Sequence, residues 1–132
     1  MSAVGAFMLL SPKEEALKRI GACRQAHAES LDLSKLLLDE IPKEVFELTW
    51  LRKLDVSYGK RLSHVPMHGM LKTIPQEIEK LSSLTELKID WNCFADISHF
   101  LKYLPQLQSL SCSDNPLTDL SALEHVPQLQ SL

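Results

Sequence analysis

Six residues, PQLQSL, occur at positions 105–110 and again at 127–132, 22 residues apart. Extending outward from the first copy shows a longer pattern. From Leu107 the chain reads LQSLSCSDNPLTDL, and from Leu84, 23 residues earlier, it reads LTELKIDWNCFADI. Both segments fit L-x-x-L-x-L-x-x-N-x-L at every key position, with other apolar residues in some leucine slots. A repeat of this length indicates stacked units, each of which buries its apolar residues only against its neighbours.

This pattern resembles the leucine-rich-repeat family, in particular the N-terminal part of an intracellular array of bacterial type. The resemblance implies an α/β solenoid, with a parallel β-sheet on the concave face and short helices or 3₁₀ turns on the convex face. Two earlier copies are less regular. The copy from Ala28 has Leu36 in the Asn slot, and the copy from Leu51 has Gly59 there. The Asn side chain is expected to bond backbone groups in the turn after each strand.

The repeats predict how the chain is organised. After Lys60 the pattern resumes ten residues late, so residues 61–70 are interpreted as an insertion. Residues 28–132 then contain about four repeats and the start of a fifth, and residues 1–27 form an N-terminal segment. Ser11, Pro12 and Glu14 predict a helix over about residues 12–27 that begins with a capping box. Its apolar face, with Leu17, Ile20 and Cys23, is expected to cover the first repeat.

Two further expectations concern the outer side and the far end of the array. Residues 41–48 and 74–81 have apolar side chains at helix-like spacing, and residues 96–104 and 119–126 resemble the shorter repeat subtype. All four segments are therefore expected on the convex side. Leu129 and Leu132 begin a fifth strand. An uncovered edge strand there suggests either a longer array or pairing with a second copy of the chain.

Composition excludes several classes of protein. The net charge is −3, from 14 Lys and Arg against 17 Asp and Glu, whereas a general nucleic-acid binder would carry a basic excess. Apolar runs are too short to span a membrane, and the first residues lack the basic stretch of a secretory signal. The three cysteines form no CxxC pair. We therefore expect an intracellular, cytoplasmic protein, with a secreted effector as the alternative.

No constellation in the sequence indicates catalysis. The S-x-x-K match at Ser57 and the S-D-N match at Ser113 occur without the K-T-G motif that completes the serine β-lactamase set. The repeat register explains both serines as outward strand positions. His64 and His68 in the insertion lack further metal ligands nearby. The chain is therefore expected to have no enzymatic activity, cofactor or metal.

The cysteines occupy different environments in the repeat register. Cys112 takes a leucine slot, so it is predicted to be buried and inert. Cys93 follows Asn92 and is predicted to face outward, which makes it the candidate reactive thiol.

Outward-pointing strand residues should form columns across the concave face, because successive repeats stack in register. In this arrangement Tyr58 and Trp91 are neighbours. Aromatic side chains ringed by charge are typical of interface hot spots, although Trp91 could instead pack locally against its own strand. The predicted partner-binding residues are Tyr58, Trp91, Lys53, Asp55, Glu86, Lys88 and Asp90.

The resulting functional hypothesis is a protein–protein interaction module that binds a partner through its concave face. An alternative is the targeting or regulatory array of a larger signalling protein, such as a Roco-type GTPase, or of a bacterial effector. A GTP-binding loop in further downstream sequence would favour the Roco-type alternative.

Overall fold

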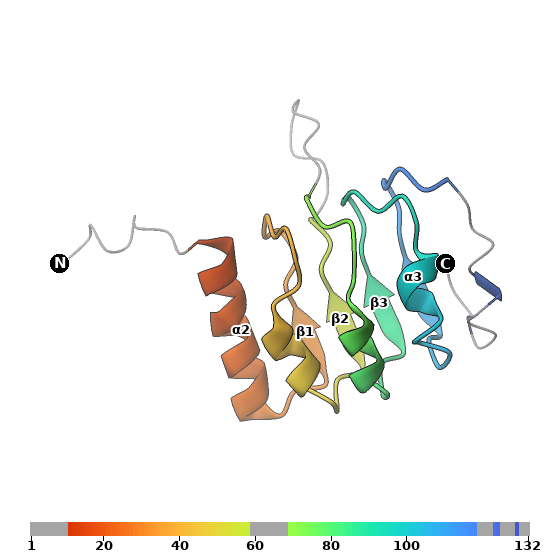
Figure 1. Cartoon of the computed structure of the whole chain (residues 1–132). Coiled ribbons are helices and arrows are strands. Elements are labelled where there is room, and N and C mark those ends of the chain that lie inside the picture. The colour runs from red at the N-terminus through yellow and green to blue at the C-terminus, as the bar shows by residue number, and fades with distance from the viewer. Residues whose placement is uncertain (1–10, 59–68, 119–122, 125–128, 130–132) are drawn as a thin grey trace.

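The computed structural model describes residues 11–58, 69–118, 123–124 and 129. A single helix stands at one end of a row of parallel strands, and short helices line one side of that row (Figure 1). Most of the predicted insertion, most of the segment 119–126 and all of the predicted fifth strand except Leu129 lie outside the described residues. The elements, in chain order, are α2 (Pro12–Ala26), β1 (Ser30–Asp32), η1 (Lys43–Glu47), β2 (Lys53–Asp55), η2 (Gln76–Lys80), β3 (Glu86–Lys88), α3 (Ser98–Leu101) and β4 (Ser109–Ser111).

The sheet confirms the register expected from the repeats. Its strands lie in the order β1-β2-β3-β4, and all neighbours are parallel. The central leucine of each strand pairs with the next, from Leu31 to Leu54, Leu87 and Leu110. These leucines point inward and are at most 4% exposed. Residues on either side of each leucine point to the opposite face, because side chains alternate along a strand.

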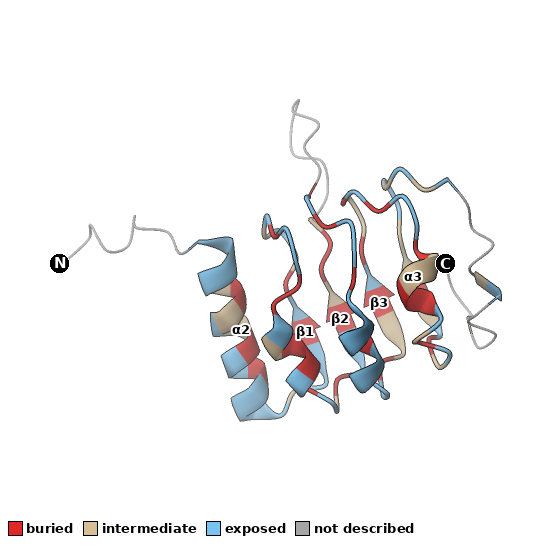
Figure 2. Cartoon of the chain, in the orientation of Figure 1, coloured by how far each residue is buried: buried red, intermediate tan, exposed pale blue. Residues whose placement is uncertain are grey.

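The core is one continuous layer between the sheet and the convex segments (Figure 2). Repeat leucines supply most of it, and Phe94 and Phe100 meet edge to face, 5.9 Å apart between ring centroids. The convex segments predicted at 41–48 and 74–81 contain the short 3₁₀ helices η1 and η2, whose C-cap residues are Leu48 and Leu81. The segment predicted at 96–104 contains the α-helical turn α3. This architecture is the expected α/β solenoid.

Helix α2 covers the exposed end of β1, as the sequence predicts. The Ser11 hydroxyl accepts from Glu14 N at 3.1 Å, and Ser11 N donates to the Glu14 carboxylate at 3.0 Å, which completes the capping box. The buried face differs in one residue from the prediction. Ala16 is fully buried, whereas Leu17 is only partly buried, because the face follows a spacing of four and then three residues to Ile20 and Cys23.

Two arginine side chains, Arg19 and Arg24, secure this helix to the first repeat. The Arg19 guanidinium donates to the carbonyls of Asp32 and Ser34, at 3.2 and 3.1 Å. These groups belong to β1 and the turn after it, at the open edge of the sheet, so Arg19 occupies acceptors that another strand could otherwise use. Arg24 forms an ion pair of 2.7 Å with Glu47 of η1.

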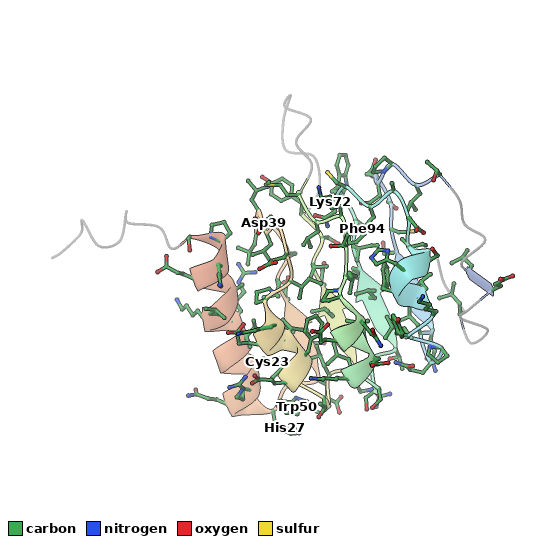
Figure 3. The ribbon with its side chains drawn as sticks, viewed as in Figure 1. Cys23, His27, Asp39, Trp50, Lys72 and Phe94 are labelled. Carbon is green, nitrogen blue, oxygen red and sulfur yellow. The ribbon has the colours of Figure 1, made fainter. Side chains whose placement is uncertain are left out.

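An aromatic stack closes the lower end of the same interface. His27 ends α2 in the left-handed conformation, with φ of 51°. Its ring lies parallel to the indole of Trp50, with centroids 3.9 Å apart (Figure 3). The indole N–H of Trp50 donates to the carbonyl of Ala28 at 2.9 Å. Trp50, which lies between η1 and β2, therefore holds the turn between α2 and β1 through both its ring and its indole N–H.

Candidate functional site

The predicted binding residues on the strands lie on one face of the sheet. Lys53 of β2 is opposite Glu86 of β3, and Asp55 is opposite Lys88. The carboxylate of Glu86 lies between two ammonium groups, 3.9 Å from that of Lys53 and 4.0 Å from that of Lys88. Ion pairs at this distance between exposed groups contribute about 0–1 kcal/mol to stability. We call these four residues, together with Tyr58, Asp90 and Trp91, the concave patch.

Acidic side chains in and beside the patch differ in how many hydrogen bonds their carboxylates accept from the rest of the chain. Asp90 is strongly engaged: its carboxylate accepts from the Ser111 hydroxyl at 2.6 Å and from Ser113 N at 2.7 Å. Asp55 accepts from Ser57 N at 2.9 Å through one oxygen. Asp90 therefore has a structural role in joining the β3 and β4 repeats, whereas the charges on the two middle strands are held more loosely.

Beside the patch, Asp32 accepts from Ser34 N in the same way as Asp55 accepts from Ser57. The hydrogen bonds from Ser34, aided by the charges of Arg19 and Lys35, hold the pKa of Asp32 below its ordinary value against the effect of burial. The Asp32 carboxylate is therefore stabilised in its charged form, next to the Arg19 contact that secures α2.

The turn after each strand positions the aromatic residues. Lys35, Trp91 and Asp114 occupy the same place in their repeats, and each has a left-handed backbone, with φ of 66°, 59° and 58°. Such a φ is strained for a bulky residue such as Trp91, and strain of this kind often accompanies functional sites. Tyr58 takes the equivalent place in the second repeat without a positive φ, and its N–H donates to the carbonyl of Asp90.

Gly69 joins these two turns at the end of the predicted insertion. Its N–H donates to the carbonyl of Trp91 at 2.7 Å, and its own carbonyl accepts from the Cys93 thiol. A β-carbon at this position would collide with the Asn92 side-chain oxygen and approach the Tyr58 β-carbon to 2.8 Å. Only glycine allows the chain to return this close to the patch.

Below the turns, Asn92 and Asn115 form the expected ladder. The Asn115 amide donates to the carbonyls of Ile89, Cys112 and Ser113, and its oxygen accepts from Asn92 N and Phe94 N. Asn92 repeats the donor pattern one repeat earlier, reaching the carbonyl of Val56 at 3.0 Å. Each Asn thus ties its own turn to the preceding repeat.

Ser57 does not occupy the outward position predicted for it. It is 6% exposed, and its hydroxyl accepts from Asp90 N at 3.0 Å, so it is a buried link between repeats. Ser113 is exposed as expected, and Lys60 lies outside the described residues. The described part of the chain brings no group of three or more His, Cys, Asp or Glu together for a metal, and His64 and His68 lie outside that part.

The two cysteines of the later repeats differ from each other as predicted, but only in part. Cys93 is exposed, and its thiol donates to Gly69. Cys112 is only half-buried rather than buried. Burial, with a smaller effect from the Asp90 carboxylate, raises the pKa of the Cys112 thiol above its ordinary value. That shift lowers its reactivity, because the thiolate is the nucleophile.

Several residues that shape the site have no signal in the repeat pattern. Arg19, the His27–Trp50 stack and Gly69 belong to the cap, a turn and the insertion. His99 is a further case, since its Nε2 accepts from Ile74 N at 3.0 Å and links two convex segments. The one sequence signal among these is that Gly69 is a glycine near the end of the predicted insertion, because glycine allows close backbone approach.

Comparisons with known proteins agree with this architecture. No family model matches the chain, and no curated protein matches it in sequence. Solved structures do match. An internalin of Listeria monocytogenes, InlF, has a TM-score of 0.55 and 25% identity over 78% of this chain and 26% of its own. A leucine-rich-repeat protein of Leptospira interrogans has a TM-score of 0.54 and 25% identity over 85% of this chain and 33% of its own.

Repeat pattern, sheet register and structural neighbours together identify the class: the chain is a leucine-rich-repeat protein. Both similar structures come from bacteria, as expected for this type of array. The chain spans about a quarter to a third of the length of these proteins. The fold is one that typically serves protein interaction. No helix among the described residues is long and apolar enough to cross a membrane.

Proposed function

We propose that the chain is a protein-interaction module that binds a partner protein across the concave patch. The observation that carries this proposal is the set of long charged side chains held outward on a hydrogen-bonded sheet, with Lys53 and Lys88 61% and 48% exposed. Because the strands and turns are already fixed, binding costs little ordering of the backbone. Tyr58 and Trp91 supply the aromatic area that interfaces use most, and the charges select the partner.

A pull-down from source-cell lysate tests this proposal. The wild type is compared with Tyr58→Ala/Trp91→Ala and with Lys53→Ala/Lys88→Ala, and circular dichroism checks that each variant is folded. The matched control is Lys43→Ala/Lys80→Ala, which removes two exposed lysines from the convex side. Loss of a hot-spot residue costs ~2 kcal/mol or more, so at least about tenfold weaker capture is expected for the concave variants. Equal capture by all variants would place binding elsewhere.

The second proposal, a targeting or regulatory array within a larger signalling protein or effector, uses the same surface. Its support is that the similar solved proteins are three to four times longer than the segment matched here. The pull-down described above also tests this proposal. Capture of a partner together with an enzyme of the same complex would support it.

A further inference from the structure

The charges on the two middle strands alternate in both directions. Along β2 the order is Lys53 and then Asp55, and along β3 it is Glu86 and then Lys88. Each strand therefore carries the opposite sign to its neighbour at the same height. A surface of this kind is complementary to its own copy, provided that the symmetry axis passes between the two strands.

A twofold axis parallel to the strands and midway between β2 and β3 gives the best match. It places β2 of one molecule opposite β3 of the other, without changing the height of any residue. Lys53 then faces Glu86 of the second copy, and Asp55 faces its Lys88. Each contact occurs twice, which gives four ion pairs. The same rotation places Tyr58 opposite Trp91 of the second copy, whereas an axis across the strands would leave both aromatic residues outside the contact.

Side-chain length across the sheet fits the same arrangement. Two concave faces that meet leave a gap that is widest over the middle strands and narrowest over the outer ones. Lys53, Glu86 and Lys88 are long and lie on the middle strands. The outer strands carry short side chains on this face: Ser30, Asp32, Ser109 and Ser111. The sheet is about 14 Å wide for four strands at ~4.8 Å spacing, so the gap is shallow enough for the long residues to fill.

Contacts within the chain leave these charges available. The two ion pairs of Glu86 are at 3.9 and 4.0 Å, at the upper limit for such pairs. We propose that the concave patch is an isologous interface at which two copies of this chain pair face to face about an axis parallel to the strands. The inference rests on the proposed function, since it uses the same surface, and it names a second copy as the partner. A sheet that is about 14 Å wide buries less surface area than a standard protein–protein interface. We therefore expect a weak dimer whose affinity falls as the salt concentration rises.

The test uses Lys53→Glu and Glu86→Lys, two exposed or half-exposed positions whose side chains are joined to the described residues by the long ion pairs given above. Each variant alone places like charges across the axis twice, so we expect its dimer, measured by sedimentation velocity at low salt, to be at least about tenfold weaker than that of the wild type. A mixture of the two variants restores opposite charges at all these contacts. We expect heterodimers with an affinity within about threefold of the wild type.

This mixing step separates contacts between copies from contacts within one chain. Each variant keeps its own internal repulsion after mixing, so recovery of the dimer arises only from pairing across the axis. An axis across the strands would place Lys53 opposite Asp55, and the mixture would then stay monomeric. A monomeric wild type, unchanged dimerisation of the single variants, or a mixture that fails to associate would each overturn the inference. If the wild type is monomeric while the concave variants still lose a captured partner, the proposed function stands and only self-pairing is wrong.

Discussion

Asn92 and Asn115 show how much a single side chain contributes to each repeat. Both amides donate three hydrogen bonds to backbone carbonyls, and one of the three reaches the preceding repeat. Asn92 is 2% exposed, so in the folded protein these bonds are shielded from solvent. The sequence has Leu36 and Gly59 in the same slot of the first two repeats, so Asn92 also serves a turn that lacks its own Asn.

Substitution of Asn92 by alanine should therefore destabilise the fold strongly. We expect a loss of about 3 kcal/mol in the free energy of unfolding, because each buried carbonyl left without a donor costs about 1–3 kcal/mol and the turn partly relaxes. Urea denaturation measures this change. Gln108→Ala, at an exposed position just before β4, is the control and should change stability by less than about 0.5 kcal/mol. A comparable effect of the two substitutions would mean that the Asn ladder is dispensable.

A second prediction at the residue scale compares two glycines. Gly69→Ala should destabilise the protein by about 1–3 kcal/mol, because the new methyl group meets Asn92 and Tyr58. Gly21→Ala should instead stabilise it by about 0.5–1 kcal/mol, since Gly21 lies inside α2 with nothing within 4 Å of the added carbon. Thermal unfolding measures both changes: the melting temperature should fall for Gly69→Ala and rise for Gly21→Ala. A neutral Gly69→Ala would show that the return of the chain at this point is not constrained.

At the scale of elements, the sequence predicts those features that depend only on the spacing of residues along the chain. The spacing of Leu31, Leu54, Leu87 and Leu110 fixes which residues pair, since a repeat adds one strand at a constant register. Ser11 and Glu14 fix the start of α2, because a capping box is a local interaction.

Other side-chain contacts join residues far apart in the sequence, and the spacing of the repeats does not specify them. Arg19 reaches carbonyls 13 and 15 residues away, and Trp50 reaches Ala28 over 22 residues. Asp90, one of the predicted partner-binding residues, also accepts hydrogen bonds from Ser111 and Ser113 of the next repeat, which no spacing in the sequence indicates. Side chains of this kind have several possible bonding partners within reach, and only the packed structure shows which one they use.

The capping box of α2 gives a pH-dependent prediction. Hydrogen bonds from the backbone and then the side chain of Ser11 hold the pKa of Glu14 below its ordinary value. A carboxylate with a lowered pKa in the folded state stabilises the fold above its unfolded pKa, and this contribution is lost as the pH falls through the folded value. The melting temperature of the wild type should exceed that of Glu14→Gln at about pH 7, and the difference should vanish at about pH 2.

The control for this comparison is Glu77→Gln, an exposed carboxylate in the first turn of η2 without a side-chain cap. Its melting temperature should follow that of the wild type at both pH values. If Glu14→Gln and Glu77→Gln respond alike, the capping box does not account for the acid sensitivity of α2.

At the scale of the whole molecule, stability should vary along the array, because each repeat contacts only its neighbours. Helix α2 packs on β1 and η1, whereas α3 packs near the opposite end against η2. Ile20 of α2 is 2% exposed, and Leu101 of α3 is fully buried. Loss of either side chain creates a cavity that costs about 2–5 kcal/mol, but at opposite ends of the same sheet.

Amide hydrogen exchange measured on Ile20→Ala and Leu101→Ala shows which end of the sheet each substitution destabilises. The amides of Leu33 and Lys35 donate to carbonyls of the second repeat, those of Asp55 and Ser57. The amides of Ile89 and Trp91 donate to carbonyls of the fourth repeat, those of Ser111 and Ser113. Ile20→Ala should accelerate exchange mainly at Leu33 and Lys35, while Leu101→Ala should do so mainly at Ile89 and Trp91. Equal acceleration at both ends by either variant would mean that the four strands open as one cooperative unit. In that case the concave patch would be held rigid by the whole array rather than by the two repeats that carry it.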